Sequence, residues 1–213
     1  MFKRNLDLRN RAKKIIPHDK ASPPRDIRIN LNINLGKRPW RIYIAAALAI
    51  LVALLVVYLV YFRSKMKELD YERGLENLSK GNFEQASKNF ENASAGKNEA
   101  DALYKLAVAK YNQKDFQGAV EAYQKALDKK PENAPVLNGL ANLYRDQKNI
   151  PLAQEYYQKA VGVDSAYVVS YSNWAIMLMD NGDIAGAKKI VAQGLEKNPG
   201  NPELANIKNM LGE

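Results

Sequence analysis

Four stretches of this sequence repeat one pattern at a nearly constant spacing. They are "KGNFEQASKNFENA" (80–93), "QKDFQGAVEAYQKA" (113–126), "QKNIPLAQEYYQKA" (147–160) and "NGDIAGAKKIVAQG" (181–194). The stretches align on Ala86, Ala119, Ala153 and Ala187, which are 33, 34 and 34 residues apart. A fixed period of this length indicates that one supersecondary unit is copied along the chain, and that each copy buries its apolar face against its neighbours. The period therefore limits the fold to a stacked array.

Small and large residues recur at fixed positions inside each unit. Four residues after each aligned alanine comes a large side chain: Phe90, Tyr123, Tyr157 and Val191. Twelve residues before each aligned alanine comes a small residue: Gly74, Ala107, Ala141 and Ala175. Small residues let two helices touch, and a large residue fills the space beside the contact. The pattern therefore predicts closely packed helices in each unit.

These markers resemble the tetratricopeptide repeat, a 34-residue unit made of two antiparallel helices. The resemblance covers about residues 67–200 and includes the helix-ending prolines Pro131 and Pro199. The following segment "PELANIKNML", residues 202–211, reads as the capping helix that such arrays require. The resemblance implies an all-α fold in which a right-handed solenoid of four repeats and a C-terminal capping helix together form residues 70–213.

An apolar run precedes the repeats. Residues 42–62, "IYIAAALAILVALLVVYLVYF", contain no charged side chain, and as a helix they would be roughly 31 Å long. Aromatic rings lie at both ends of the run, as they do at headgroup level: Trp40, Tyr43, Tyr58, Tyr61 and Phe62. The run predicts a single transmembrane helix at 42–62, followed by a helical connector at 63–69.

The net charge of +9 predicts the orientation of this helix. Residues 1–41 carry 12 Lys+Arg against 3 Asp+Glu, and the rest of the chain carries 20 of each. The positive-inside rule then places the tail in the cytoplasm and the repeats outside it, in a bacterial inner membrane. A cleaved signal peptide is the alternative, but its apolar stretch is typically about 7–15 residues long. The run here is longer and predicts a permanent anchor.

Three alanines in the apolar run suggest a contact between two copies. Ala45, Ala49 and Ala53 lie four residues apart on one helix face. This spacing of small residues lets membrane helices approach closely. A homodimer through this face is one expectation, and the general abundance of alanine in such spans is the alternative.

The sequence argues against catalysis. It has no cysteine, and its one histidine is His18 in the tail. The repeats thus lack the commonest general base and the commonest transition-metal ligands. Acidic residues alternate with lysines, as in "EAYQKALDKK", which is typical of solvated helix faces. We therefore expect neither an enzyme nor a cofactor, and no nucleic-acid partner.

The expected activity is protein or peptide binding on the concave side of the array, which the first helices of the repeats form. By the geometry of the family, the exposed positions of these helices are Tyr71, Leu75, Tyr104, Val108, Tyr111, Asn138, Asn142, Arg145, Ser172, Ile176 and Met179. Tyrosines offer rigid apolar area with a hydroxyl group, and asparagines pair with backbone amides. The alternative is that several of these residues only pack against the neighbouring repeat.

The basic tail contains a strand-like segment at 27–35, "IRINLNINL". One face of this segment would carry Ile27, Ile29, Leu31, Ile33 and Leu35. The repeated "INL" resembles the tail of PilN-type pilus assembly proteins, which docks on a cytoplasmic partner. Docking on a protein sheet edge, contact with anionic lipid through the neighbouring basic residues, and disorder are the three alternatives.

Together these features predict a single-pass membrane protein whose outward repeats bind other proteins. Its expected role is that of a scaffold that assists assembly of an envelope, secretion or pilus complex. A periplasmic chaperone-like holder of unfolded chains is one alternative. An organelle-anchored receptor with cytosolic repeats is another, and it requires the opposite topology.

Overall fold

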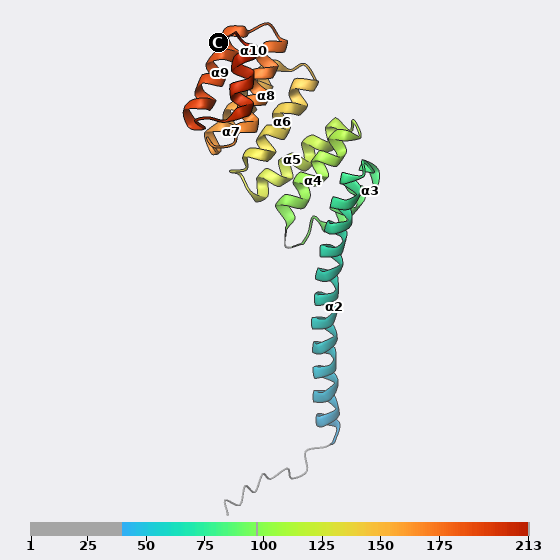
Figure 1. Ribbon diagram of the computed structural model, residues 1–213. Helices are drawn as coiled ribbons and strands as arrows, with labels where there is room; N and C mark the ends of the chain where they lie inside the picture. The colour runs from blue at the N-terminus through green and yellow to red at the C-terminus, as the bar shows by residue number, and fades with distance from the viewer. Residues whose placement is uncertain (1–39, 97, 213) are drawn as a thin grey trace, which may run out of the picture. The chain divides into compact units, whose positions relative to one another are not determined.

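The computed structural model describes residues 40–96 and 98–212, which fold into helices joined by short loops and include no strand (Figure 1). In chain order the helices are α2 (Trp40–Ser79), α3 (Phe83–Ala93), α4 (Glu99–Asn112), α5 (Phe116–Lys129), α6 (Ala134–Asp146), α7 (Ile150–Val163), α8 (Val168–Asp180), α9 (Ile184–Lys197) and α10 (Pro202–Met210). The predicted all-α class is confirmed. The predicted strand at 27–35 lies outside the described residues.

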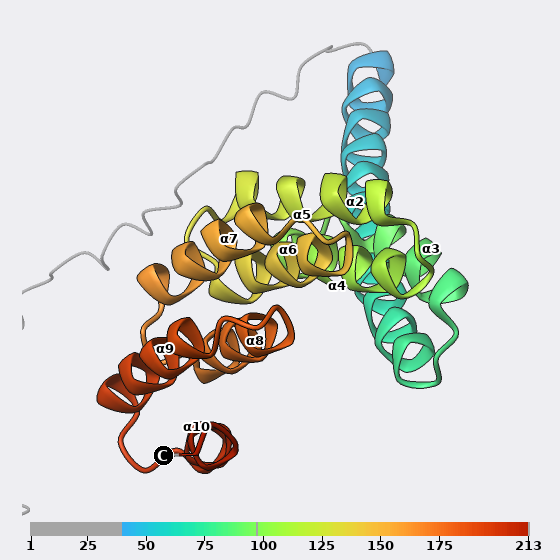
Figure 2. The ribbon, with the colours of Figure 1, turned by 90° about the horizontal axis from the view of Figure 1, so that it is seen from above.

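The chain divides into two units between Ala49 and Ile50. In the first unit the described residues are helical and form the start of α2. The second unit holds the rest of α2 and the paired helices α3 to α10, which are seen from above in Figure 2. All the packing described below lies within this second unit.

Helix α2 has 40 residues, and its N-terminal and C-terminal parts differ in how far they are buried. Residues 40–66 are exposed throughout, and an 18-residue window of the helix has a mean hydropathy of 2.9 with none of it buried. By length and composition, α2 is able to cross a membrane. Toward its C-terminus the helix packs into the array, where Gly74 is buried. No helix break separates the predicted span from the predicted connector.

The small and large marker residues lie where the sequence pattern predicts contact. The aligned alanines Ala86, Ala119, Ala153 and Ala187 are 0% exposed. The large residues that follow them are buried as well: Phe90 (0%), Tyr123 (3%), Tyr157 (0%) and Val191 (1%). The helix-pair solenoid is thus confirmed, because each pair closes on a small residue and fills the gap beside it with a large one.

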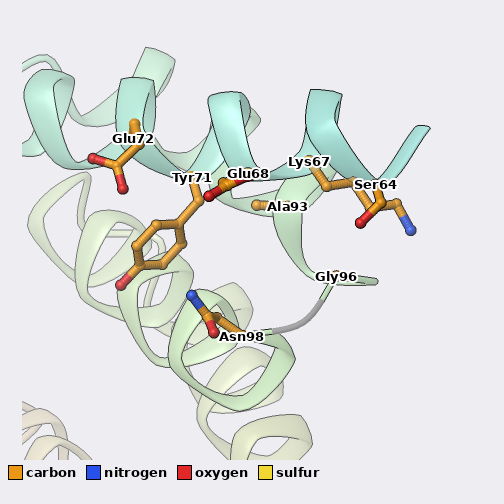
Figure 3. A pocket seen from close by; sticks show the side chains of 8 residues that line it. All are labelled: Ser64, Lys67, Glu68, Tyr71, Glu72, Ala93, Gly96 and Asn98. Carbon is orange, nitrogen blue, oxygen red and sulfur yellow. The ribbon is translucent and has the colours of Figure 1, made fainter. Parts of the chain in front are cut away.

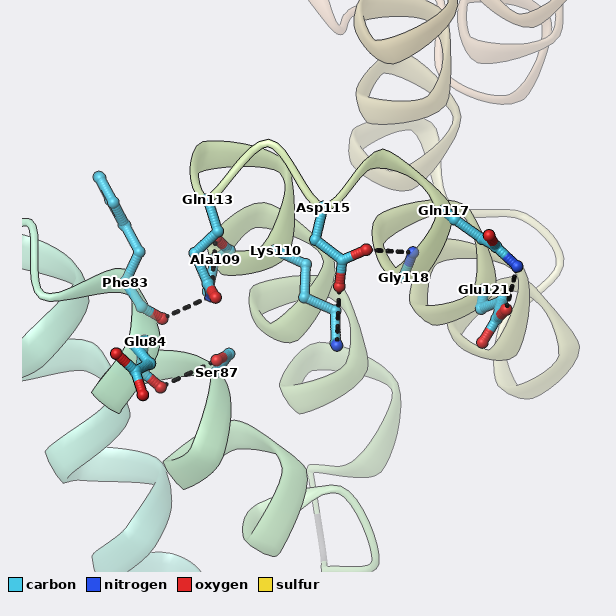
Figure 4. A network of polar contacts seen from close by, with 10 residues as sticks. All are labelled: Phe83, Glu84, Ser87, Ala109, Lys110, Gln113, Asp115, Gln117, Gly118 and Glu121. Atoms are coloured by element: carbon cyan, nitrogen blue, oxygen red, sulfur yellow. Dashed lines mark hydrogen bonds and ion pairs between the residues drawn. The ribbon is translucent and has the colours of Figure 1, made fainter.

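A regular turn joins the two helices of every repeat. A left-handed residue stands at the same place in each turn, namely Gly81, Lys114, Lys148 and Gly182, with φ of 75, 67, 62 and 81°. One residue later comes the N-cap of the second helix. In the second repeat this cap is Asp115, whose Oδ1 accepts a 2.9 Å hydrogen bond from Gly118 N (Figure 4). This bond and the Lys110 ammonium 3.1 Å away lower the pKa of Asp115.

Helix α10 closes the C-terminal end of the array. Leu204 and Ile207 are 0% and 4% exposed and join the apolar cluster of α8 and α9. The polar side of α10 faces solvent. A repeat array needs such a cap, because the last repeat has no further neighbour to cover its apolar face.

Candidate functional site

The predicted contact residues lie on the first helices α4, α6 and α8, which contact one another in succession. They form three rows with a spacing of 34 residues, each running across α4, α6 and α8 in that order. The first row is Tyr104, Asn138 and Ser172, the second is Val108, Asn142 and Ile176, and the third is Tyr111, Arg145 and Met179. Tyr71 and Leu75 occupy related places on α2. We call the surface of these rows the inner face.

Two tyrosines of the inner face form hydrogen bonds to the next repeat. Tyr71 Oη on α2 donates a hydrogen bond to Asp101 on α4. Tyr111 Oη on α4 donates to Asp146 on α6. Both rings also pack on their own repeat, and the Tyr71 ring meets Phe90 edge-on at 5.8 Å between centroids. For these two residues, packing between repeats is the role that the structure shows.

The prediction of exposure is wrong for Asn138 and Ser172. Asn138 is 6% exposed, and its Oδ1 accepts hydrogen bonds from Ser170 Oγ at 3.3 Å and Asn173 Nδ2 at 3.2 Å. Ser172 is 1% exposed, and its Oγ has no partner among the described residues. The two residues are buried because α6 and α8 approach closely at this row. Asn138 therefore joins two repeats, and neither side chain is exposed to solvent.

The second row is at least partly exposed to solvent on each of three repeats. Val108 is partly buried, and Ile176 is 39% exposed. Between them lies Asn142, whose Oδ1 accepts a 2.5 Å hydrogen bond from Tyr157 Oη. That bond orients the amide and leaves its N–H donors for a partner. The row therefore offers two apolar contacts on either side of an oriented hydrogen-bond donor.

A charged hollow of about 400 Å³ lies at the far end of the inner face. Its walls include Arg145 and Asp146, whose guanidinium and carboxylate are 3.0 Å apart, and Asp180 of α8. Burial lowers the pKa of Arg145, but Tyr157 and Asp146 more than offset this effect, and the net shift is upward. Arg145 thus stays charged, and Met179, the last residue of the same row, is partly buried.

A second hollow lies where α2 meets the end of α3 (Figure 3). It has a volume of about 280 Å³ and is lined by Ser64, Lys67, Glu68, Tyr71, Glu72, Ala93, Gly96 and Asn98. Lys67 Nζ donates a 2.6 Å hydrogen bond to the carbonyl oxygen of Ala95. This bond ties α2 to the loop after α3, and the hollow is mainly a polar feature of that junction.

Buried tyrosines make the array sensitive to alkaline pH. Burial, and next the hydrogen bond to Asp146, raises the pKa of Tyr111 to about 12. Burial also raises the pKa of Tyr123 and Tyr157. Tyrosine in an unfolded chain titrates near pH 10, so the unfolded chain loses protons first and is favoured above that pH.

We therefore expect the urea midpoint of the array to be constant up to about pH 9 and to fall between pH 10 and 12. Far-UV circular dichroism of the full chain in detergent measures this midpoint. A Tyr111→Phe variant removes one of the shifted groups and should show a shallower fall. A midpoint that stays constant from pH 9 to 11 in the wild type would contradict the expectation.

The polar contacts between repeats were not found from the sequence. The hydrogen bonds from Tyr71 to Asp101 and from Tyr111 to Asp146 span 30 and 35 residues. The bonds of Asn138 span 32 and 35 residues. All four separations lie close to the repeat period. The signal that could have revealed these contacts is a pair of polar residues about one period apart in the sequence.

Comparison with known families agrees with this architecture. A family model of the tetratricopeptide repeat matches residues 71–134 and 104–168, which together reach from α2 into α8. A search of curated proteins gives no match. The matched ranges contain most of the inner face.

Three solved structures show how far the similarity extends. Pseudomonas aeruginosa pilF is 27% identical, with a TM-score of 0.59 over 70% of this chain and 68% of that one. MamA is 20% identical, with a TM-score of 0.54 over 62% and 78%. A tetratricopeptide repeat protein from Parabacteroides merdae is 18% identical, with a TM-score of 0.58 over 69% and 59%. The last two similarities concern the fold alone.

Proposed function

Because this chain is a tetratricopeptide-repeat protein, we propose that it is a membrane-anchored scaffold that holds a partner protein on its inner face. Tetratricopeptide repeats are protein-interaction modules. One observation carries the choice of surface: Val108, Asn142 and Ile176 are each at least partly exposed on three successive repeats, whereas Asn138 and Ser172 of the neighbouring row are buried. The partner that fits this row has apolar side chains on either side of a hydrogen-bond acceptor, as an extended peptide or a loop has.

The anchor in this proposal is the apolar part of α2. The basic tail before it and the balanced charge after it support a cytoplasmic tail and an array on the other side of the membrane. This layout supports a role in assembly of an envelope, secretion or pilus complex. The similarity to pilF of Pseudomonas aeruginosa supports a bacterial setting, and the charge distribution around the apolar run supports the inner membrane.

The topology is tested by protease treatment of right-side-out cells that express the full chain. We expect cleavage to release the repeats while residues 1–41 stay protected. The expectation follows from the 12 Lys+Arg of the tail, which the positive-inside rule keeps in the cytoplasm. Repeats that are cleaved only after the membrane is broken would reverse the topology and favour the cytosolic receptor.

The inner face is tested by photo-crosslinking from Ile176 in the same cells. We expect one stoichiometric partner. With the crosslinker moved to Val108 of the same row, an Ile176→Asp change should lower its recovery about tenfold, because a carboxylate in an apolar contact is costly. The change should leave the fold intact, since Ile176 is 39% exposed.

The matched control places the crosslinker at Lys125, an exposed residue of the second helix α5. Recovery of the same partner with equal yield from Lys125 would move the binding surface away from the inner face. Recovery of many unrelated proteins from Ile176 would favour the chaperone-like holder over the scaffold.

A further inference from the structure

The end of α3 lies beside the part of α2 that directly follows the apolar run. Gly74 of α2 lies against the Phe90 ring of α3. Farther back along α2, Lys67 Nζ donates its hydrogen bond to the carbonyl oxygen of Ala95, just after α3. Positions on α3 advance as positions on α2 recede, so the two helices are antiparallel. The loop after α3 is therefore brought next to the first turns of α2 outside the apolar run (Figure 3).

The length of the apolar run gives the height of this loop above the hydrocarbon core. The run at 42–62 is roughly as long as the core is thick, so Phe62 marks its outer edge. The core is about 30 Å thick and the whole bilayer about 40–45 Å, which leaves about 5–7.5 Å for each headgroup layer. Lys67 lies about 7.5 Å beyond Phe62 along the helix. Because Lys67 is bonded to Ala95, the loop lies at the level of the lipid headgroups.

The charges along α2 are sorted at the same height. Three basic residues follow the apolar run: Arg63, Lys65 and Lys67. Three acidic residues come next: Glu68, Asp70 and Glu72. At 1.5 Å per residue, the basic group ends about 7.5 Å beyond the run and the acidic group begins at about 9 Å. The cations are thus confined to the headgroup layer, and the carboxylates begin outside it.

Two of these cations are available to an anion in that layer. Arg63 is exposed and pairs with no described residue. Lys67 pairs with no described carboxylate, and its bond to Ala95 uses one of three N–H donors. Lys65 is 2.7 Å from Glu68, but both side chains are 63% exposed, and such a surface pair is weak. The anions found at this height are lipid phosphates, to which guanidinium and ammonium groups donate strong hydrogen bonds.

We propose that Arg63, Lys67 and the loop residues Ala95 and Gly96 form a surface that binds phospholipid headgroups of the leaflet on the array's side, with a preference for anionic ones. This inference rests on the membrane anchor of the proposed function. The two cations contact phosphates, and the bond from Lys67 to Ala95 holds the loop in the same layer. The glutamates of the neighbouring hollow lie farther from the core and are not part of this surface. The first repeat is thus seated on the bilayer.

Depth-dependent fluorescence quenching of the full chain in lipid nanodiscs tests this surface. The chain has no cysteine, so Ala95→Cys at an exposed position gives one site for a bimane label. The control is Lys80→Cys in the turn at the other end of α3, about 27 Å beyond Phe62. The discs contain phosphatidylcholine and phosphatidylglycerol, one of which carries a nitroxide near its headgroup. We expect at least threefold stronger quenching from residue 95 than from residue 80, because only the first lies in the headgroup layer. Equal quenching would overturn the proposal.

Charge variants of the Ala95→Cys chain test the role of the cations. In the parent chain, nitroxide on phosphatidylglycerol should quench more strongly than nitroxide on phosphatidylcholine. Arg63→Gln combined with Lys67→Gln should abolish this difference, whereas Lys125→Gln on α5 should leave it unchanged. The difference between the two lipids is a readout that loosening of the loop alone would not remove. A difference that persists in the double variant would overturn the proposal.

A label in the apolar run separates failure of this surface from failure of the anchor. Val52→Cys carries the same bimane label, and the quencher is a nitroxide deep in the acyl chain. Quenching at residue 52 without quenching at residue 95 would overturn the headgroup surface and leave the anchor standing. Absence of quenching at both positions would overturn both.

Discussion

A Gly139→Ala chain is expected to unfold at a clearly lower urea concentration than the wild type, with a loss of about 2 kcal/mol in the free energy of unfolding. Gly139 lies in α6 against α5. A Cβ at this position would lie 2.6 Å from Cζ and Oη of Tyr123, well inside the contact distance. Alanine gains about 1 kcal/mol in helix propensity over glycine, and the clash must exceed this gain.

The clash is expected to exceed the gain because Tyr123 cannot move away. Its side chain is 3% exposed, and its ring lies 6.1 Å from the Tyr104 ring. A ring held on several sides transmits the strain to its neighbours, as close-packed interiors do. The two helices would have to separate, and the same contact also sets the distance between the second and third repeats.

Gly162→Ala is the matched control. Gly162 also lies in a helix, near the end of α7, and a Cβ there meets no atom within 4 Å. This change should be neutral or raise the free energy of unfolding by up to about 1 kcal/mol. Urea unfolding followed by far-UV circular dichroism in detergent measures both variants. A Gly139→Ala chain as stable as the Gly162→Ala chain would show that Tyr123 is free to adjust.

The packing of small and large residues was predictable because it repeats. Ala119 and Tyr123 have the same neighbours as Ala153 and Tyr157 one period later, so four copies of one weak signal add up. The capping helix was predictable for a different reason, because an array ends in an apolar face that needs a cover. Local periodicity and steric size carry this information, and neither depends on the exact distance between helices.

The polar part of the inner face was not predictable in the same way. Asn138 and Ser172 share a row with Tyr104, and the geometry of the family suggested that this row faces solvent. Their burial depends on the distance between α6 and α8, which small residues on both helices reduce. Tyr71 and Tyr111 likewise find acceptors on the next repeat only because the offset between first helices places an aspartate there. Such pairings follow from the geometry of the whole array.

Replacing Tyr157 by alanine is expected to have the largest effect on the array, about 3–5 kcal/mol. Tyr157 is 0% exposed, its ring stacks on Trp174 of α8 with 15° between the planes, and its hydroxyl donates to Asn142 of α6. The side chain therefore joins the third repeat to the fourth. Its loss leaves a cavity and an unsatisfied amide oxygen at that junction.

The location of this loss matters as much as its size. In a repeat array, stability is approximately a sum of repeats and of interfaces between neighbours. Weakening the junction of α7 and α8 should therefore uncouple α8, α9 and α10 from the helices before them. In a Trp40→Phe background, which leaves Trp174 as the remaining tryptophan, the Trp174 emission should then report unfolding at a lower urea concentration than the circular dichroism of the whole array.

Tyr157→Phe separates packing from hydrogen bonding at the same position. It keeps the ring on Trp174 and removes only the bond to Asn142, so a loss of about 1 kcal/mol with coincident transitions is expected. If Tyr157→Ala also shows coincident transitions, the four repeats unfold as one cooperative unit, and the junction is no weaker than the repeats it joins. If the transitions separate, the last repeat unfolds as a separate and weaker unit, and partner binding across this junction would be coupled to its folding.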